Sequence, residues 1–297
     1  GWLDADVFQS KQIKGKKLKL TYDVVTGNRY YLNRIDYRIY DPIIEKLVKD
    51  DQPLSLLKKG EPFDLNVLDN ERSRITRFLQ NSGYYKFTKE YVRFEADTCV
   101  GGQLVDISIV IPLYKANINK EEEYHKKYDI RSVTFVTSSP LSDFAKEFHN
   151  MDSIHYKGFP IYYKSRLPFR PSIYTNNNSI EKGKMYMERD MQRTYSNYGQ
   201  LGAVMFSNIM MLEHDSLSNE LDCYIALHEN KKRSFGAELE GTNSAGDLGA
   251  ALSITYQNRN IFKGSELFSL EFRGAFEAIT GLEGYADQNY MEFSVEA

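Results

Sequence analysis

The side chains that most often perform chemistry are present in this chain, but their spacing matches no reaction site. None of the five histidines has the spacing of metal ligands or lies in a motif with a partner carboxylate or thiol. The sequence contains no Gly-x-Ser-x-Gly elbow, phosphate-binding loop or dinucleotide fingerprint. We therefore expect no enzyme, no catalytic residue, no metal and no cofactor. We interpret the histidines as surface or hydrogen-bonded residues: His125, His149, His155, His214 and His228.

An acidic run and two cysteines are the other candidates for chemistry. The glutamates at 121–123 stand beside the lysines at 126–127, a pattern typical of a solvated linker rather than of paired catalytic carboxylates. Cys99 and Cys223 fall in different predicted domains, each in or near a predicted strand. We interpret both as buried small hydrophobic residues rather than as a disulfide.

Length and composition set further limits. A chain of 297 residues is long enough for two or more domains, and 27% charged with 41% hydrophobic residues is typical of folded proteins. The net charge of −3 does not favour a nucleic-acid partner. No apolar run of about 18 residues occurs, so we expect no transmembrane helix.

The strongest pattern lies after residue 233, where apolar and polar residues alternate along consecutive segments at 248–257, 268–277 and 290–297. Because successive side chains of a strand point to opposite faces, each segment has one apolar and one polar face. Runs of roughly 9–11 residues, separated by Gly- or Asn-rich turns, suit tilted strands that cross a bilayer. Such strands require a closed barrel of about 8 or more. Only about four are present, so we expect this chain to be a piece of a longer protein.

The alternation also predicts where individual side chains lie. Leu252, Phe272 and Phe293 should contact lipid, whereas the charged residues of the opposite parity should line an enclosed aqueous space. A soluble β-sandwich would show a similar alternation and remains an alternative. The charged residues are Glu238, Glu240, Glu271, Arg273 and Glu277.

Ahead of these strands, residues 29–112 predict one compact unit in the order strand, helix, helix, strand, strand. A strand at 30–39 is followed by a helix that starts at Asp41-Pro42, a capping residue and a proline at the first helical position. Asp64 can cap a second helix with apolar residues at helical spacing, which ends at Gly83. Strands at 87–96 and 103–111 complete the unit.

The same order returns in residues 128–229, which favours an internal repeat. A strand at 128–136, a helix at 187–198 and strands at 203–212 and 220–229 correspond to the first copy. Aligning Gly83 with Gly199 matches Leu79 with Tyr195. The second copy contains an insertion at 138–171 with a hairpin around 158–160. Residues 2–7 and 17–24 resemble the closing strand pair of a third copy, with Gly27 as a tight junction.

These units resemble the POTRA modules of the BamA/TamA superfamily of outer-membrane assembly factors. The resemblance rests on residues 81–87 (Asn-Ser-Gly-Tyr-Tyr-Lys-Phe), where the end of a helix is followed by a glycine and aromatic residues. Residues 183–199 look like the same arrangement in the last unit. Residues 235–266 look like the first barrel hairpin and second turn of TamA-like proteins of Bacteroidetes, often called TamL. The likeness spans nearly the whole chain. The remaining barrel strands and the loop that plugs the lumen are absent from this sequence.

The resemblance implies an α+β fold of tandem POTRA modules (β-α-α-β-β) followed by the first antiparallel strands of a transmembrane β-barrel. The implied domains are 1–27, a strand pair of one module, and 28–115, a complete module. Residues 126–230 then form the last module with its insertion at 138–171, and 231–297 form the first strands of an outer-membrane barrel.

The implied function is assembly or translocation of outer-membrane proteins, with the modules in the periplasm. Each module would bind extended client strands at its sheet edge, and the first barrel strand would form one side of a lateral seam. The predicted edge residues are Phe87, Lys89, Tyr91, Arg93, Met205, Ser207, Ile209 and Met211. The predicted seam residues are Phe235, Gly236, Ala237, Leu239 and Gly241.

The implied partners are unfolded outer-membrane or surface proteins, the lipid bilayer of the outer membrane, and an inner-membrane or periplasmic protein as a further candidate. Nucleic acid is not among them. Three alternatives stay open. They are an essential BamA-type insertase, a two-partner secretion pore that exports one dedicated client, and a soluble all-β binding protein.

Overall fold

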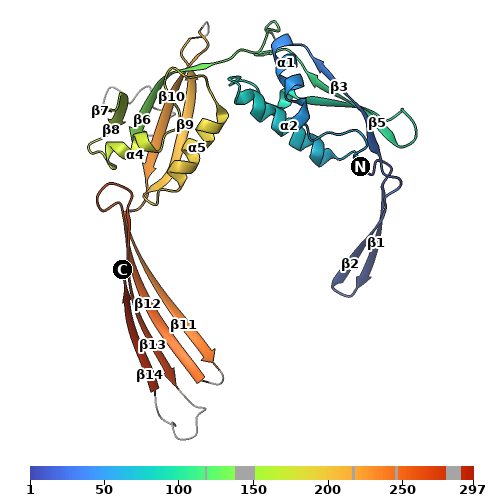
Figure 1. Cartoon of the computed structure of the whole chain (residues 1–297). Helices are drawn as coiled ribbons and strands as arrows, with labels where there is room; N and C mark the ends of the chain where they lie inside the picture. The colour runs from blue at the N-terminus through green and yellow to red at the C-terminus, as the bar shows by residue number, and fades with distance from the viewer. Residues whose placement is uncertain (118, 138–150, 216–217, 245–246, 279–288) are drawn as a thin grey trace. The chain divides into compact units, whose positions relative to one another are not determined.

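Four separate β-sheets organise the chain, which the computed structural model describes except at residues 118, 138–150, 216–217, 245–246 and 279–288 (Figure 1). The structure divides into two units. The first comprises Gly1–Tyr128 with Met185–Glu188, and the second comprises Asp129–Lys184 with Arg189–Ala297. Among the described residues, no helix is both long and apolar enough to cross a bilayer.

The first unit contains the predicted strand-helix-helix-strand-strand order. Its elements are β3 (Tyr31–Ile39), α1 (Pro42–Asp50), the short 3₁₀ helix η1 (Gln52–Leu54), α2 (Leu65–Gln80), the 3₁₀ helix η2 (Lys89–Tyr91), β4 (Arg93–Asp97) and β5 (Leu104–Ile111). In the sheet, β5 lies in the middle, parallel to β3 and antiparallel to β4. The strand β4 is therefore at an edge, as predicted.

Local capping explains where the two helices start. The Asp41 carboxylate accepts hydrogen bonds from the backbone N–H groups of Ile43 (3.0 Å) and Ile44 (3.3 Å), and proline occupies the first turn of α1. The Asp64 carboxylate accepts from Asn66 N at 2.8 Å. Both helices pack on the sheet through a buried apolar core that includes Ile44, Val48, Leu68, Ile75, Leu79, Phe87, Ile107 and Ile109.

Gly83 confirms the predicted end of α2. Its φ of +97° lies in the left-handed region, which side chains other than glycine rarely adopt. A Cβ at this position would also lie 2.7 Å from the sulfur of Met185, which belongs to the same unit. Gly199, by contrast, is the last residue of α5 and has no positive φ. Both glycines thus lie at helix ends, but Gly83 ends α2 through a left-handed backbone and Gly199 does not.

The strand predicted at 87–96 begins six residues later than expected, at Arg93. Phe87 is fully buried in the core, its carbonyl accepts from Gln80 Nε2 at 2.9 Å, and its ring lies 5.0 Å from that of His125. Lys89 and Tyr91 belong to η2. The β-forming composition of this stretch could not reveal that its first half packs beneath α2 instead of extending the sheet.

The chain after β5 folds back onto the first unit through Asp41. The second oxygen of this buried carboxylate accepts from His125 N at 3.0 Å, while the His125 ring lies 3.1 Å from the Pro112 carbonyl. Burial lowers the pKa of His125, so its imidazole is neutral at neutral pH. His125 is thus a hydrogen-bonded residue of the core. The prediction of a solvated linker holds for the exposed residues 121–124 and 126–127, whereas His125 between them is buried.

The second unit begins with a five-stranded sheet in the order β7-β8-β6-β10-β9. Its strands are β6 (Asp129–Thr137), β7 (Asp152–Tyr156), β8 (Phe159–Tyr163), β9 (Val204–Glu213) and β10 (Glu220–Glu229). The helices are α4 (Pro171–Asn176) and α5 (Glu188–Gly199). The hairpin β7–β8 turns at Lys157 and Gly158, as predicted, and extends the sheet beside β6. Part of the predicted insertion, 138–150, lies outside the described residues.

Two further sheets complete the structure. The strands β1 (Asp6–Lys14) and β2 (Lys17–Val25) form a hairpin whose residues are all exposed. Gly27 follows it with φ +67°, and a Cβ there would lie 3.1 Å from Asp4, so this junction is tight, as expected. In the second unit, β11 (Arg233–Ser244), β12 (Asp247–Arg259), β13 (Leu267–Ala278) and β14 (Asn289–Glu296) form an antiparallel sheet in chain order.

The two cysteines differ in environment. Cys223 is fully buried on β10, and burial raises the pKa of its thiol, in line with the interpretation as a small hydrophobic residue. Cys99 is exposed on the loop between β4 and β5, where its N–H donates to the Asp97 carboxylate at 2.9 Å. The prediction that Cys99 is buried is wrong, because it falls beyond the end of the strand.

A buried carboxylate holds the loop after α1 against α2. Glu71 is fully buried and accepts hydrogen bonds from Ser55 Oγ, Leu56 N and both Nε and Nη2 of Arg74, all at 2.9 Å. Arg74 also pairs with Asp51. Burial alone would raise the pKa of Glu71, but the hydrogen bonds from Arg74, Leu56 and Ser55 lower it overall.

Replacing Glu71 with alanine should destabilise the first unit by about 3 kcal/mol at pH 7, because Arg74 and the Leu56 amide lose a buried partner. A depressed carboxyl pKa stabilises the fold above the unfolded pKa, and this contribution disappears as pH falls through the folded pKa. The difference between wild type and Glu71→Ala should therefore shrink below about pH 4. Hydrogen exchange of the α2 amides at pH 7 and pH 3.5 measures both effects.

The matched control is Glu45→Gln, which removes an exposed carboxylate from an ion pair with Lys49 on α1. It should change stability by less than about 0.5 kcal/mol at either pH. Equal protection of α2 in wild type and Glu71→Ala would show that the buried carboxylate contributes nothing.

Candidate functional site

The C-terminal sheet has two chemically opposite faces, and its register aligns them across all four strands. Leu239 pairs with Leu252, which pairs with Gly274, which pairs with Phe293. Because paired residues share a face, the predicted lipid-facing residues Leu252, Phe272 and Phe293 lie on one side of the sheet. The exposed large side chains of this apolar face are Phe235, Leu239, Leu248, Leu252, Ile254, Phe268, Phe272, Phe276, Met291, Phe293 and Val295.

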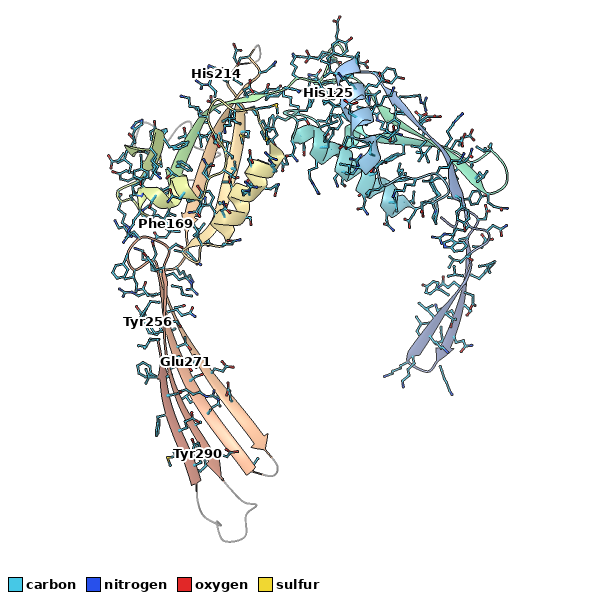
Figure 2. The ribbon with its side chains drawn as sticks, viewed as in Figure 1. His125, Phe169, His214, Tyr256, Glu271 and Tyr290 are labelled. Atoms are coloured by element: carbon cyan, nitrogen blue, oxygen red, sulfur yellow. The ribbon has the colours of Figure 1, made fainter. Side chains whose placement is uncertain are left out.

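The opposite face is polar. The register places the five predicted charged residues, Glu238, Glu240, Glu271, Arg273 and Glu277, together on it. Nη2 of Arg273 on β13 lies 2.7 Å from a carboxylate oxygen of Glu240 on β11, across the intervening strand. Of the residues labelled in Figure 2, Tyr256 lies on the apolar face, and Glu271 and Tyr290 lie on the polar face.

Large apolar side chains are exposed on all four strands of this sheet. On β12, Ala251 and Ser253 of the polar face are buried, at 5% and 8% exposed, whereas Leu252 between them is 50% exposed. On β14, Phe293 is 82% exposed. A continuous exposed apolar surface of this kind marks contact with another apolar phase or partner.

The predicted seam residues lie on β11, which is at one edge of this sheet. All five are exposed, Phe235 and Leu239 at 76% and 79%, and Phe235 packs against the Tyr256 ring. Ala237 shares their face, whereas Gly236 points to the polar side. A Cβ at Gly236 would approach only Thr255, at 3.9 Å, and one at Gly241 would meet none of the described atoms within 4 Å. Crowding by the described neighbours therefore does not explain either glycine.

The turn between β12 and β13 is fastened to the module in the same unit. The side chain of Asn260 is buried, donating through Nδ2 to the Pro168 carbonyl at 2.9 Å and accepting from Ser265 N at 3.1 Å. Lys263 O accepts from Arg170 N at 2.7 Å. Ser265 Oγ accepts from Ala203 N at 3.1 Å. Two loops of the module, before α4 and before β9, are thereby bound to one turn.

Backbone strain accompanies this turn. Asn260, Lys263 and Ser265 have φ values of +79°, +62° and +63°, a region that costs energy for residues other than glycine. Asparagine tolerates this region better than most residues, which accounts for Asn260. The surrounding hydrogen bonds hold the other two in place.

The predicted strand edges are placed differently in the two modules. In the first, only Arg93 of the four predicted residues lies on β4, since Phe87, Lys89 and Tyr91 precede the strand. Arg72 of α2 approaches this edge, and its Nε donates to the Val92 carbonyl at 2.9 Å. In the second, β9 contains all four predicted residues. Ile209 and Met211 are buried, Ser207 is half-buried and Met205 is exposed.

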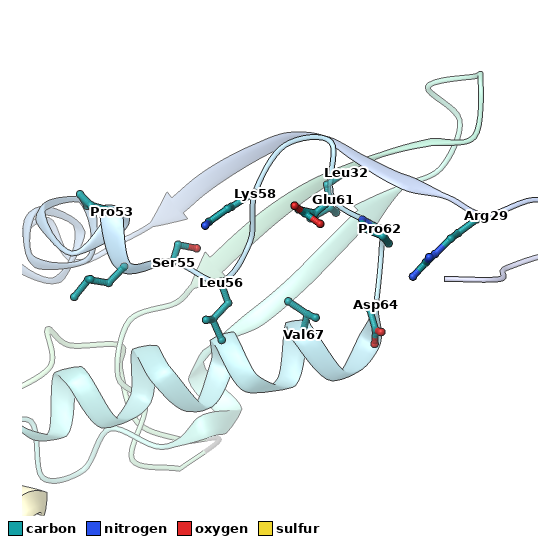
Figure 3. Close-up of a pocket in the computed structure, with 11 residues that line it drawn as sticks. Arg29, Leu32, Pro53, Ser55, Leu56, Lys58, Glu61, Pro62, Asp64 and Val67 are labelled. Atoms are coloured by element: carbon teal, nitrogen blue, oxygen red, sulfur yellow. The ribbon is translucent and has the colours of Figure 1, made fainter.

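A groove of about 560 Å³ was not anticipated from the sequence (Figure 3). It lies in the first unit beside the loop after α1 and the start of α2. Because loop residues form most of its wall, no periodic pattern could have revealed it. Its lining combines apolar side chains with charges of both signs: Arg29, Leu32, Pro53, Leu54, Ser55, Leu56, Lys58, Glu61, Pro62, Asp64 and Val67.

Of the other histidines, His149 lies outside the described residues and His155 is exposed on β7, whereas His228 and His214 contact neighbouring side chains. His228 stacks on Phe206 with ring centroids 4.0 Å apart, and His214 Nδ1 lies 3.6 Å from the Asp222 carboxylate. Within the part of the chain that the structure describes, no group of three or more His, Cys, Asp or Glu side chains could hold a metal ion.

No protein-family model and no curated protein matches this chain, but solved structures resemble it. The crystal structure of BamA from Haemophilus ducreyi lacking POTRA domains 1–3 superposes with a TM-score of 0.51 at 13% identity, over 84% of this chain and 38% of that chain. POTRA domains 3–5 of Haemophilus influenzae BamA give a TM-score of 0.45 at 14% identity, over 77% and 74%. CdiB from Acinetobacter baumannii gives 0.37 at 9% identity, over 84% and 41%.

The likeness to Haemophilus ducreyi BamA shows a shared fold and confirms the resemblance at that level. The present chain spans 38% of the length of that BamA chain. The likeness therefore concerns the fold of this part and not the activity or partners of a whole protein. These likenesses do not separate the BamA, TamA and TamL branches.

Replacing Asn260 with alanine should loosen the β12–β13 turn. The change removes two side-chain hydrogen bonds and places alanine at φ +79°, for a combined cost of about 2–3 kcal/mol. The Ser265 amide, which donates to Asn260, should then exchange with solvent faster. Hydrogen exchange in detergent measures this.

Lys263→Ala is the matched control, because it shortens a side chain in the same turn and keeps both the positive φ and the backbone contact to Arg170. It should leave exchange of the Ser265 amide unchanged. If Asn260→Ala behaved like Lys263→Ala, the turn would not depend on the asparagine.

Proposed function

We propose that this chain is the periplasmic POTRA array and first barrel strands of an outer-membrane protein assembly and translocation factor of the TamA type, in the TamL branch. The observation that supports it best is the division of the C-terminal sheet into an exposed apolar face that is continuous over β11 to β14 and an opposite face that carries the charged side chains. Lipid on the apolar side and an enclosed aqueous space on the charged side explain this division.

The lengths of the strands suit a bilayer. The strands β11, β12 and β13, of 12, 13 and 12 residues, are long enough to cross a hydrocarbon core when tilted.

The modules supply the proposed client-binding surfaces. The edge strands β4 and β9 present backbone groups that extended client strands can pair with, and backbone pairing suits a factor that handles many clients. The edge β11, with Phe235, Gly236, Ala237, Leu239 and Gly241, is the proposed side of the lateral seam. The proposal includes no cofactor.

The N-terminal hairpin supports the proposed third module. On one face of β1–β2, Val7, Ile13, Leu18 and Leu20 are exposed together with Tyr22. A two-stranded hairpin is marginally stable alone, and an uncovered apolar face calls for helices of the kind that α1 and α2 provide in the first unit. We therefore propose the domain boundaries given above, with residues 1–27 as the closing strand pair of another module.

The membrane assignment is tested by placing a charge on each face. In the longer protein assembled in lipid vesicles, Leu252→Arg should destabilise the barrel by about 2–4 kcal/mol, because the charge would lie in hydrocarbon. Thr255→Arg on the same strand but the polar face should be tolerated. The fraction of folded protein after urea titration in vesicles measures both. Equal tolerance of the two variants, or a monodisperse protein without detergent, would refute the membrane sheet.

The client assignment is tested by depleting the protein in cells. A general assembly factor should lower the levels of many outer-membrane and surface proteins, and quantitative proteomics of purified outer membranes measures this. Loss of one secreted protein alone would instead support a two-partner secretion pore.

A further inference from the structure

The side chain of Tyr195 occupies both backbone hydrogen-bonding groups of Ile209, in the middle of the edge strand β9. Ile209 N donates to the Tyr195 hydroxyl of α5 at 2.9 Å, and the same hydroxyl donates to Ile209 O at 3.2 Å. A hydroxyl has one donor and acceptor lone pairs, so it satisfies both backbone groups of one residue. In an antiparallel ladder, a residue of a neighbouring strand makes the same pair of hydrogen bonds.

The direction of these groups defines the edge. Ile209 pairs with Ile225 of β10, yet its N–H and C=O point to Tyr195, so they face away from β10. Backbone groups alternate along a strand, and those of Ser207 therefore face the same way. Among the described strands, β9 is the last in its sheet.

The two modules protect their edges differently. Of the five residues of β4, three are charged (Arg93, Glu95 and Asp97), and charge is a common protection against unwanted strand pairing. Of the ten residues of β9, only Glu213 is charged. The β9 edge thus lacks charge and instead has a removable hydrogen-bonding partner.

We propose that Tyr195 is a gate on the β9 edge, and that an extended polypeptide strand binds there by displacing its hydroxyl. This inference rests on the proposed client-binding function. The occupant is an extended strand because the groups released are one backbone donor and one backbone acceptor on an uncharged edge. The incoming strand replaces the two hydrogen bonds of Tyr195 with two of its own and adds further pairs along β9.

The gate is tested with Tyr195→Phe in the 297-residue chain in detergent. The ring stays and only the hydroxyl is lost, so the Ile209 amide should exchange with solvent at least about tenfold faster. Tyr163→Phe is the matched control, since β8 is separated from β9 by β6 and β10. The control should leave exchange at Ile209 unchanged.

Binding is measured by fluorescence anisotropy with a labelled synthetic peptide of the sequence of β13, an alternating strand of this same chain. Tyr195→Phe should bind the peptide on the order of fivefold more tightly than wild type, because no hydroxyl competes for Ile209. Ser207→Pro should weaken binding in either background, since it removes an outward-facing N–H while leaving the pairing with β10 intact.

The outcomes separate the gate from the function on which it rests. Unchanged exchange at Ile209 in Tyr195→Phe overturns the gate, whatever the peptide does. Peptide binding that is equal in wild type and Tyr195→Phe, and lost in Ser207→Pro, overturns the gate but leaves client binding at β9 standing. Faster exchange at Ile209 with no peptide binding by any variant overturns both the gate and client binding at β9. The Tyr195 hydroxyl would then only satisfy the backbone groups of Ile209.

Discussion

The need to satisfy backbone hydrogen-bonding groups at strand edges constrains this structure more than any single side-chain contact. Each sheet of the described chain ends in strands with one unpaired side, and each such side is a place where another strand can add. The structure meets this need with charges on β4 and with a tyrosine hydroxyl on β9. The sites proposed for clients are therefore the same places that must be protected when no client is present.

The second constraint is the polarity of the surroundings. In the modules, apolar side chains lie between helices and sheet, as water requires. In the sheet β11–β14, large apolar side chains such as Leu239 and Phe293 are instead exposed. Within the second unit, large apolar side chains thus change from mostly buried on β10 to exposed on β11.

Much of the fold was predictable because its signals are local. Asp41, Pro42 and Asp64 mark helix starts through contacts within three residues, and Gly83 marks a stop through its own φ. Strand alternation after residue 233 gave the two faces correctly, since the period of two does not depend on neighbours. The start of β4 could not be found this way, because Phe87 leaves the sheet only through its burial under α2.

The candidate site was less predictable than the fold. The sequence indicated β9 as an edge, but the contact of Tyr195 with Ile209 joins residues of two elements and depends on how α5 packs. The turn at Asn260 was noticed only as part of a resemblance, because its partners, Pro168 and Ala203, lie far away in the sequence. Contacts of this kind leave no periodic signal.

The fastened turn between β12 and β13 has a mechanical consequence. A sheet joined to its module only by the linker at residue 230 could pivot freely, but the bonds from Asn260, Lys263 and Ser265 add a second point of attachment. With two attachment points, the sheet cannot rotate freely about the linker. A push on the loops around Arg170 or Ala203 would therefore be transmitted as torque to the base of the β12–β13 hairpin.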